Sequence, residues 1–201
     1  MAERKYIAYV QHHGTTDFNE NPPRYTGYWD IPLNDKGILG AEKAAEFLSS
    51  CEIQSVYSSP LRRARRTAEI IVSRLGGRYI CETSCLFPWH LPTLWGMEKS
   101  EFEEKLKPYV DKPNRRPEFG ETLEEFRERI ADFFEDKLSC HCPTLFVTHT
   151  SDIIALKESL TGEASSEKVV GPGGLVGIYE DGDGYGLEVL LGKEIEADYG
   201  K

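Results

Sequence analysis

Two of the five histidines in the chain, His12 and His13, stand together at the end of a short apolar run and directly before Gly14. His149 ends a second apolar run, and Arg63 belongs to an arginine-rich segment that follows a third. A neutral imidazole can attack phosphorus and carry the phosphoryl group as a covalent intermediate. Arginine presents a planar fork of donors that matches phosphate oxygens. If the fold brings these side chains together, they are suited to phosphoryl transfer without a metal.

Each of these residues also has an ordinary structural interpretation. A histidine that ends a strand is usually a satisfied polar residue, an adjacent pair could be a metal clip or two turn residues, and RRARR is usually a solvated helix face. Their occurrence after three separate apolar runs favours a shared site, because ligands of open α/β sheets bind beyond the carboxyl ends of the strands. A helix expected to start near Pro60 would add a favourable N-terminal dipole for an anion.

Apolar runs and helical patterns alternate along the chain and define the elements that must position these residues. Strands are expected at 6–11, 53–59, 78–84 and 144–150, helices at 40–50, 60–75, 121–138 and 151–162, and a hairpin with Gly and Asp at its turn at 173–192. In the second helix, Ser59 fits the N-cap, Pro60 the first turn, and Gly76 and Gly77 the stop. The alternation predicts a layered α/β domain with a mostly parallel central sheet.

Residues 86–118 interrupt this rhythm with several prolines and aromatic side chains, and a short helix is expected at 98–110. Segments of this kind often cover a site. We therefore expect a specificity or lid insertion at about 86–118 within a single domain spanning 1–201. Its aromatic residues, Trp89 and Trp95 among them, could equally belong to the core.

Composition narrows the class of protein. The 24 basic and 34 acidic residues give a net charge of −10, which argues against a nucleic-acid partner. No apolar run approaches the roughly 20 residues that span a bilayer, and the first residues do not resemble a secretory signal. The five cysteines are then expected to be free thiols in the cytoplasm, and their spacings do not match structural zinc pairs, so neither a metal nor a cofactor is expected. Oligomeric state is not predicted.

Together the motifs resemble the histidine phosphatase superfamily, which contains the cofactor-dependent phosphoglycerate mutases. HHGTTDFN resembles the family's Arg-His-Gly motif, YSSPLRRARRTAEII its phosphate-binding arginine motif, GETLEEFRERI its GES helix and VTHT its VSHG motif, while residues 24–48 fit the segment between the first two. The resemblance spans most of the chain. It implies a phosphoglycerate mutase-like fold, a three-layer αβα sandwich.

The resemblance also implies a role for individual residues. His13 takes the position of the nucleophile, with Arg63 and His149 as the other catalytic residues. The implied ligand is a phosphate or a small phosphorylated molecule. The residues that would help to bind it are His12, Gly14, Thr16, Asn19 and Thr150.

Three positions depart from the family pattern. His12 replaces an arginine, Thr150 replaces a glycine, and Pro88 stands where many members have the glutamate that protonates the leaving oxygen. The candidate proton donors that remain are His90 and Asp152, unless the leaving group needs no proton. Because the ordinary pKa of histidine is about 6.5, we expect His12 to hold phosphate less tightly as pH rises above that value.

The sequence therefore predicts a metal-independent phosphatase that acts on a small phosphorylated substrate through a phosphohistidine intermediate at His13. The alternative is a catalytically impaired member that binds an anionic ligand or a partner without turnover, which the residues at positions 12 and 88 favour. A mutase is less favoured, because nothing in the sequence indicates that the phosphoryl group is retained and returned to a second hydroxyl.

Overall fold

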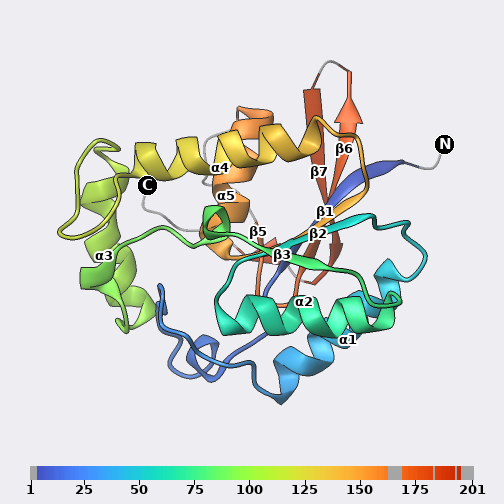
Figure 1. Cartoon of the computed structure of the whole chain (residues 1–201). Helices are drawn as coiled ribbons and strands as arrows, with labels where there is room; N and C mark the ends of the chain where they lie inside the picture. Colours follow the sequence, from blue (N-terminus) through green and yellow to red (C-terminus); the bar gives the residue numbers. More distant parts are fainter. Residues whose placement is uncertain (1–3, 163–168, 183, 193, 196–201) are drawn as a thin grey trace.

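A six-stranded sheet forms the middle layer of the structure, a computed structural model that describes residues 4–162, 169–182, 184–192 and 194–195 (Figure 1). The strands run in the order β3-β2-β4-β1-β6-β7. Strands β1 to β4 are parallel, whereas β6 and β7 are antiparallel and form one edge, so the mostly parallel sheet is confirmed. The strands are β1 (Tyr6–His12), β2 (Ser55–Ser58), β3 (Ile80–Glu82), β4 (Thr144–Thr148), β6 (Leu175–Asp181) and β7 (Gly184–Leu191), and a separate small sheet pairs β5 (Val169–Val170) with β8 (Glu194–Ile195).

Helices cover both faces of the sheet. They are α1 (Asp35–Leu48), α2 (Arg62–Arg74), α3 (Lys99–Val110), α4 (Leu123–Leu138) and α5 (Thr150–Thr161), with short 3-10 helices at Asp17–Asn19, Ser84–Leu86 and Pro92–Leu94. Because successive strand residues point to opposite faces, Leu145 and Val147 of β4 pack with α1 and α2, whereas Phe146 packs with α4 and α5. Figure 1 shows these two pairs of helices on opposite sides of the sheet. The predicted three-layer αβα sandwich is confirmed.

Helix α1 begins at Asp35, so the expected start at residue 40 is wrong. The Asn34 side chain accepts a hydrogen bond from the Gly37 backbone at 3.0 Å and caps the helix there. A Cβ on Gly37 would lie 2.2 Å from the Thr15 carbonyl oxygen, and one on Gly14 would lie 2.5 Å from the Gly37 carbonyl oxygen. The two glycines therefore let the start of α1 pack directly against the segment that follows His13.

Helix α2 begins at Arg62, so the expected N-cap at Ser59 and first turn at Pro60 are also wrong. Leu61 is the N-cap, and the Arg62 backbone N–H donates to the Asp30 carboxylate at 2.7 Å, a partner more than 30 positions away. The helix ends at Arg74, and Gly76 and Gly77 follow it with φ of +85° and +75°, which confirms the predicted stop.

The segment 86–118 is part of the folded core. Its expected helix is confirmed as α3, and Leu86, Trp89, Leu91 and Leu106 are buried in the same cluster as the inner faces of α4 and α5. Trp89 is thus a core residue. The expected C-terminal hairpin is formed by β6 and β7, with Asp183 of its turn outside the described residues. In the part of the chain that the structure describes, no helix is long and apolar enough to cross a membrane.

Candidate active site

The predicted catalytic residues meet at the carboxyl ends of β1 and β4. These strands are parallel neighbours with His12 paired to Thr148, so the next residues, His13 and His149, leave the sheet side by side. Arg63, in the first turn of α2, reaches the same place. One cavity of about 350 Å³ is lined by His12, His13, Arg63 and His149.

Arg63 links His13 and His149. Its side chain is 1% exposed, and its Nε donates to Nε2 of His13 at 3.2 Å, while Nη2 lies 3.3 Å from Nδ1 of His149. Nη1 and Nη2 also donate to the carbonyl oxygens of Trp29 and Gly27, at 2.8 Å each. The four contacts hold the guanidinium in one orientation between the imidazole rings.

The hydrogen bonds of His13 indicate which ring nitrogen carries the proton. Nδ1 lies 2.8 Å from the Gly14 carbonyl oxygen, which can only accept. We therefore assign the proton to Nδ1, which leaves the lone pair on Nε2, the atom that faces Arg63.

His149 is oriented in a similar way. Its Nδ1 faces Arg63, which can only donate, so we place the proton on Nε2, which donates to Ser59 Oγ at 2.9 Å. Ser59 therefore orients His149. Sequence reasoning missed this role, because it assigned Ser59 to a helix cap.

Burial keeps these imidazoles neutral. Burial lowers the pKa of His13 and of His149 well below 6.5, and nearby positive charge, including that of Arg63, lowers both further. Burial also lowers the pKa of Arg63, to about 10, so its guanidinium remains charged at neutral pH. A neutral nucleophile beside a permanent cation suits attack on a phosphate.

Two of the departures from the family pattern contact each other. Nε2 of His12 lies 3.3 Å from Thr150 Oγ1, and its Nδ1 lies 3.2 Å from the Val170 carbonyl oxygen. Burial lowers the pKa of His12 to about 4, although the carbonyl contacts oppose this shift. In the free protein His12 is therefore neutral from well below pH 6.5. The resemblance would place a longer arginine and a glycine at these two positions.

Restoring both family residues is expected to strengthen phosphate binding. For the variant His12→Arg with Thr150→Gly, we expect about 10–100-fold tighter binding near neutral pH, since one hydrogen bond from a charged group contributes about 1.5–3 kcal/mol. Bound phosphate raises the pKa of His12 in the parent. Protonated His12 therefore strengthens phosphate binding fully below about pH 4, and this contribution is lost as pH rises through the pKa of His12 in the complex. The advantage of the variant should therefore grow with pH.

Calorimetry with inorganic phosphate at about pH 5 and about pH 8 measures the ratio of the variant's affinity to the parent's. The titration of phosphate itself affects both proteins and cancels in this ratio. His12→Arg alone is the control, because Thr150 occupies the space that the longer side chain needs. A ratio that stays constant over this range would contradict protonation of His12 by the bound anion.

Among the other predicted phosphate ligands, Asn19 and Thr150 line the cavity, whereas Gly14 and Thr16 do not. Gly14 donates its backbone N–H to Thr67 Oγ1 at 2.9 Å. Both the backbone N–H and the hydroxyl of Thr16 donate to Oδ1 of Asn19, at 2.9 Å each. Gly14 and Thr16 therefore position the residues beside them, and the fixed Asn19 amide keeps its N–H donors for another acceptor.

Neither predicted proton donor lines the cavity. His90 stacks on Tyr28 with 4.5 Å between ring centroids, and burial lowers the pKa of His90. Asp152 is 0% exposed, and its carboxyl group is hydrogen-bonded to the Thr148 and Ser151 hydroxyls. Pro88, which cannot donate a proton, does line the cavity.

The outer part of the cavity carries charges that sequence reasoning did not single out. Arg24, Lys99 and Glu103 line it, with Lys99 and Glu103 of α3 paired at 3.4 Å. Their spacing, four residues apart in the expected helix at 98–110, was the available signal for this pair. Segment 86–118 thus contributes both charged and apolar surface to the cavity wall.

The comparison with known proteins decides the family. Residues 9–170 match the histidine phosphatase superfamily, branch 1. The chain belongs to this superfamily. The match includes His12, His13, Arg63 and His149, which are the residues that the fold brings together around the cavity.

Relatives within the superfamily are named as phosphatases or mutases. The chain is 31% identical over 191 residues to phosphoglycerate mutase-like protein 4 of Arabidopsis thaliana, covering 90% of this chain and 82% of that protein. It is 32% identical over 163 residues to the uncharacterized phosphatase PhoE of Bacillus subtilis, covering 75% of each. A mycobacterial glucosyl-3-phosphoglycerate phosphatase has the same fold, with a TM-score of 0.76 and 21% identity over 92% of this chain and 98% of that one.

Among the residues that the structure describes, no group of three or more His, Cys, Asp and Glu side chains is arranged to hold a metal ion. His13 and His149 instead contact the Arg63 guanidinium, whose charge would oppose a bound cation.

Proposed function

We propose that this member of the superfamily is a metal-independent phosphatase that hydrolyses a small phosphorylated substrate through a phosphohistidine at His13. The observation that carries the proposal is the Nε2 lone pair of His13, held by the Gly14 carbonyl and directed at Arg63. The names of the relatives support phosphatase chemistry at a coarse level. Neither a metal nor a cofactor is part of the proposal. The free thiols favour the cytoplasm as the location.

The proposed reaction has two displacements at phosphorus. The phosphate enters the cavity, where Arg63, Asn19 and the N-terminus of α5 at Thr150 offer donors and positive potential. Nε2 of His13 attacks phosphorus and the bond to the leaving oxygen breaks. Water then attacks the phosphohistidine, and phosphate leaves. Arg63 stabilises the charge on the equatorial oxygens in both transition states.

A catalytically impaired binding protein is the second candidate. Two observations favour it. Buried His12 is neutral, so one positive charge is missing from the residues that would bind phosphate, and Pro88 lies in the cavity wall. Such a protein would bind phosphate without turnover, so a trapped covalent intermediate separates the two candidates.

Rapid quenching is the direct test. We expect mixing with p-nitrophenyl phosphate, followed by an alkaline quench and peptide mass spectrometry, to locate the phosphoryl group on His13. His141→Asn is a matched control that removes an exposed histidine outside the cavity and should not change the labelling. Phosphate release without any labelled His13 would contradict the covalent mechanism, and binding without release would favour the second candidate.

A further inference from the structure

The leaving oxygen of a phosphate ester needs a proton unless its alcohol is strongly acidic. In the described part of the chain, Pro88 occupies the cavity wall without a proton to give, and His90 does not face the cavity. One hydroxyl in that wall, however, is hydrogen-bonded to a buried carboxyl group. That hydroxyl belongs to Ser151, and the carboxyl group belongs to Asp152.

We propose that Ser151 donates the proton to the leaving oxygen and that Asp152 replaces it through their hydrogen bond. This inference rests on the proposed function and names the proton source that the phosphatase reaction lacks. Ser151 would be the catalytic residue, since it lines the cavity that would hold the substrate, and Asp152 would act through it.

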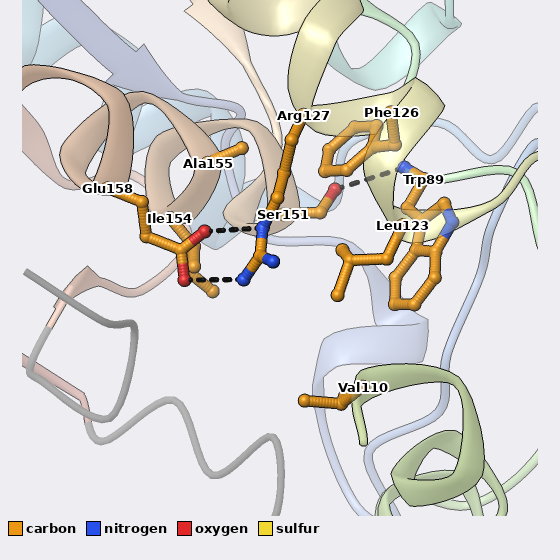
Figure 2. Close-up of a pocket in the computed structure, with 9 residues that line it drawn as sticks. All are labelled: Trp89, Val110, Leu123, Phe126, Arg127, Ser151, Ile154, Ala155 and Glu158. Carbon is orange, nitrogen blue, oxygen red and sulfur yellow. Dashed lines mark hydrogen bonds and ion pairs between the residues drawn. The ribbon is translucent and has the colours of Figure 1, made fainter. Parts of the chain in front are cut away.

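The geometry connects the cavity with the buried carboxyl group. Ser151 Oγ lies 3.1 Å from Oδ1 of Asp152 and accepts a hydrogen bond from the Trp89 backbone N–H at 3.2 Å. Figure 2 shows this bond between Ser151 and Trp89, beside the side chains of Leu123 and Phe126. Because Trp89 directly follows Pro88, the Ser151 hydroxyl lies close to Pro88, the cavity residue that has no proton to donate.

The surroundings of Asp152 keep a proton available. Burial raises the pKa of Asp152 to about 8, although the Thr148 and Ser151 hydroxyls and Arg129 oppose this shift. Glu121 raises the pKa further. The charge of Arg63 and the phenol of Tyr28 also interact with this carboxyl group. An aspartate in the first turn of a helix is usually ionised, but here burial outweighs the dipole and the carboxyl group is protonated at neutral pH.

The transfer balances over one turnover. In the first displacement the N–P bond forms, the P–O bond breaks, the leaving oxygen takes the Ser151 proton, and Ser151 takes the proton of Asp152. In the second, the N–P bond breaks as water attacks, and the water proton passes through Ser151 to the Asp152 carboxylate. The products are an alcohol and phosphate, and both residues return to their starting states.

Glu103 is the competing donor, since it also lines the cavity. Its carboxyl group is paired with Lys99 at 3.4 Å. Glu103 is thus engaged with a cation, whereas Asp152 is hydrogen-bonded to a hydroxyl of the cavity wall.

The test compares two leaving groups in the full-length protein. With butyl phosphate, whose alcohol is a poor leaving group, we expect Ser151→Ala and Asp152→Asn to lower kcat about 10²–10⁴-fold. With p-nitrophenyl phosphate the loss should stay below about 10-fold. Ser151→Thr keeps the hydroxyl and should restore turnover of butyl phosphate. The parent should lose activity on butyl phosphate as pH rises through about 8, and Asp152→Asn should lack that limb.

Equal losses on both esters in Ser151→Ala, with turnover still dependent on His13, would overturn the relay and leave the phosphatase intact. A selective loss on butyl phosphate in Glu103→Gln would also overturn it, because the proton would then come from Glu103. If neither ester shows turnover above that of a His13→Ala variant, the phosphatase proposal and the relay both fail. Thermal unfolding of each variant shows whether a loss reflects the fold.

Discussion

Replacing His13 with glycine is expected to lower kcat/KM for p-nitrophenyl phosphate roughly 10⁴–10⁶-fold, as removal of a covalent nucleophile does in other enzymes. The side chain is buried between the rings of His12 and His149, so its removal leaves space for an imidazole. Arg63 keeps its contacts with the Gly27 and Trp29 carbonyl oxygens and stays in position. Added imidazole should therefore accept the phosphoryl group in place of His13 and restore part of the activity.

The rescue distinguishes a lost nucleophile from a damaged fold. N-phosphoimidazole should be detectable during turnover of His13→Gly, and its yield should saturate with imidazole concentration. His149→Gly serves as a control, because it opens a similar space beside Arg63 but leaves His13 as the phosphoryl acceptor, so no N-phosphoimidazole should form. Activity of His13→Gly that remains near that of the parent, without imidazole, would refute the role of His13.

The layered α/β arrangement was predictable from the sequence, because each strand is a short apolar run that is bounded by a helical pattern. Helix starts were less predictable, since they depend on partners distant in the chain. Asp30 caps α2 across 32 positions, and Ser59, an apparent N-cap, is drawn to His149 instead. Local pattern reports the propensity of a segment, whereas these hydrogen bonds form only when tertiary structure brings the groups together.

The site was predictable to the extent that its residues end strands. His13, His149 and Arg63 follow three parallel strands, and parallel strands end at one edge. The contact between His12 and Thr150 was not predictable, because it depends on the register of β1 against β4. The link from Ser151 to Trp89 depends on how segment 86–118 packs, which its composition does not specify.

The pH expectation for His12 shows why burial must be known before a titration is predicted. The sequence supports an unperturbed histidine, with a pKa near 6.5. The structure buries the ring, and burial outweighs two carbonyl contacts and lowers the pKa of His12 to about 4. Protonating His12, which would help to hold phosphate, therefore costs more free energy than the sequence suggests. Phosphate binding then depends more heavily on Arg63.

Arg63→Met is accordingly expected to lower kcat/KM about 10³-fold or more, in line with the loss of an arginine that stabilises a transferring phosphoryl group. Repulsion from the Arg63 guanidinium adds to burial and to His12 in lowering the pKa of His13, so its removal should raise that pKa. The acid limb of the pH–rate profile should then move to higher pH. A residue with only a structural role would not produce this shift.

The stability of Arg63→Met reflects two opposing effects. Two carbonyl oxygens lose a donor, at about 1–3 kcal/mol each, while the cost of burying a charge disappears. We expect a net destabilisation of about 1–3 kcal/mol in chemical denaturation, so the variant should remain folded and its kinetics can be measured. Arg66→Met, on the same helix with only a surface ion pair to Glu69, is the matched control. Equal losses of activity in the two variants would show that Arg63 acts on the fold rather than on phosphate. A loss confined to Arg63→Met would identify Arg63 as the charge on which phosphate binding relies.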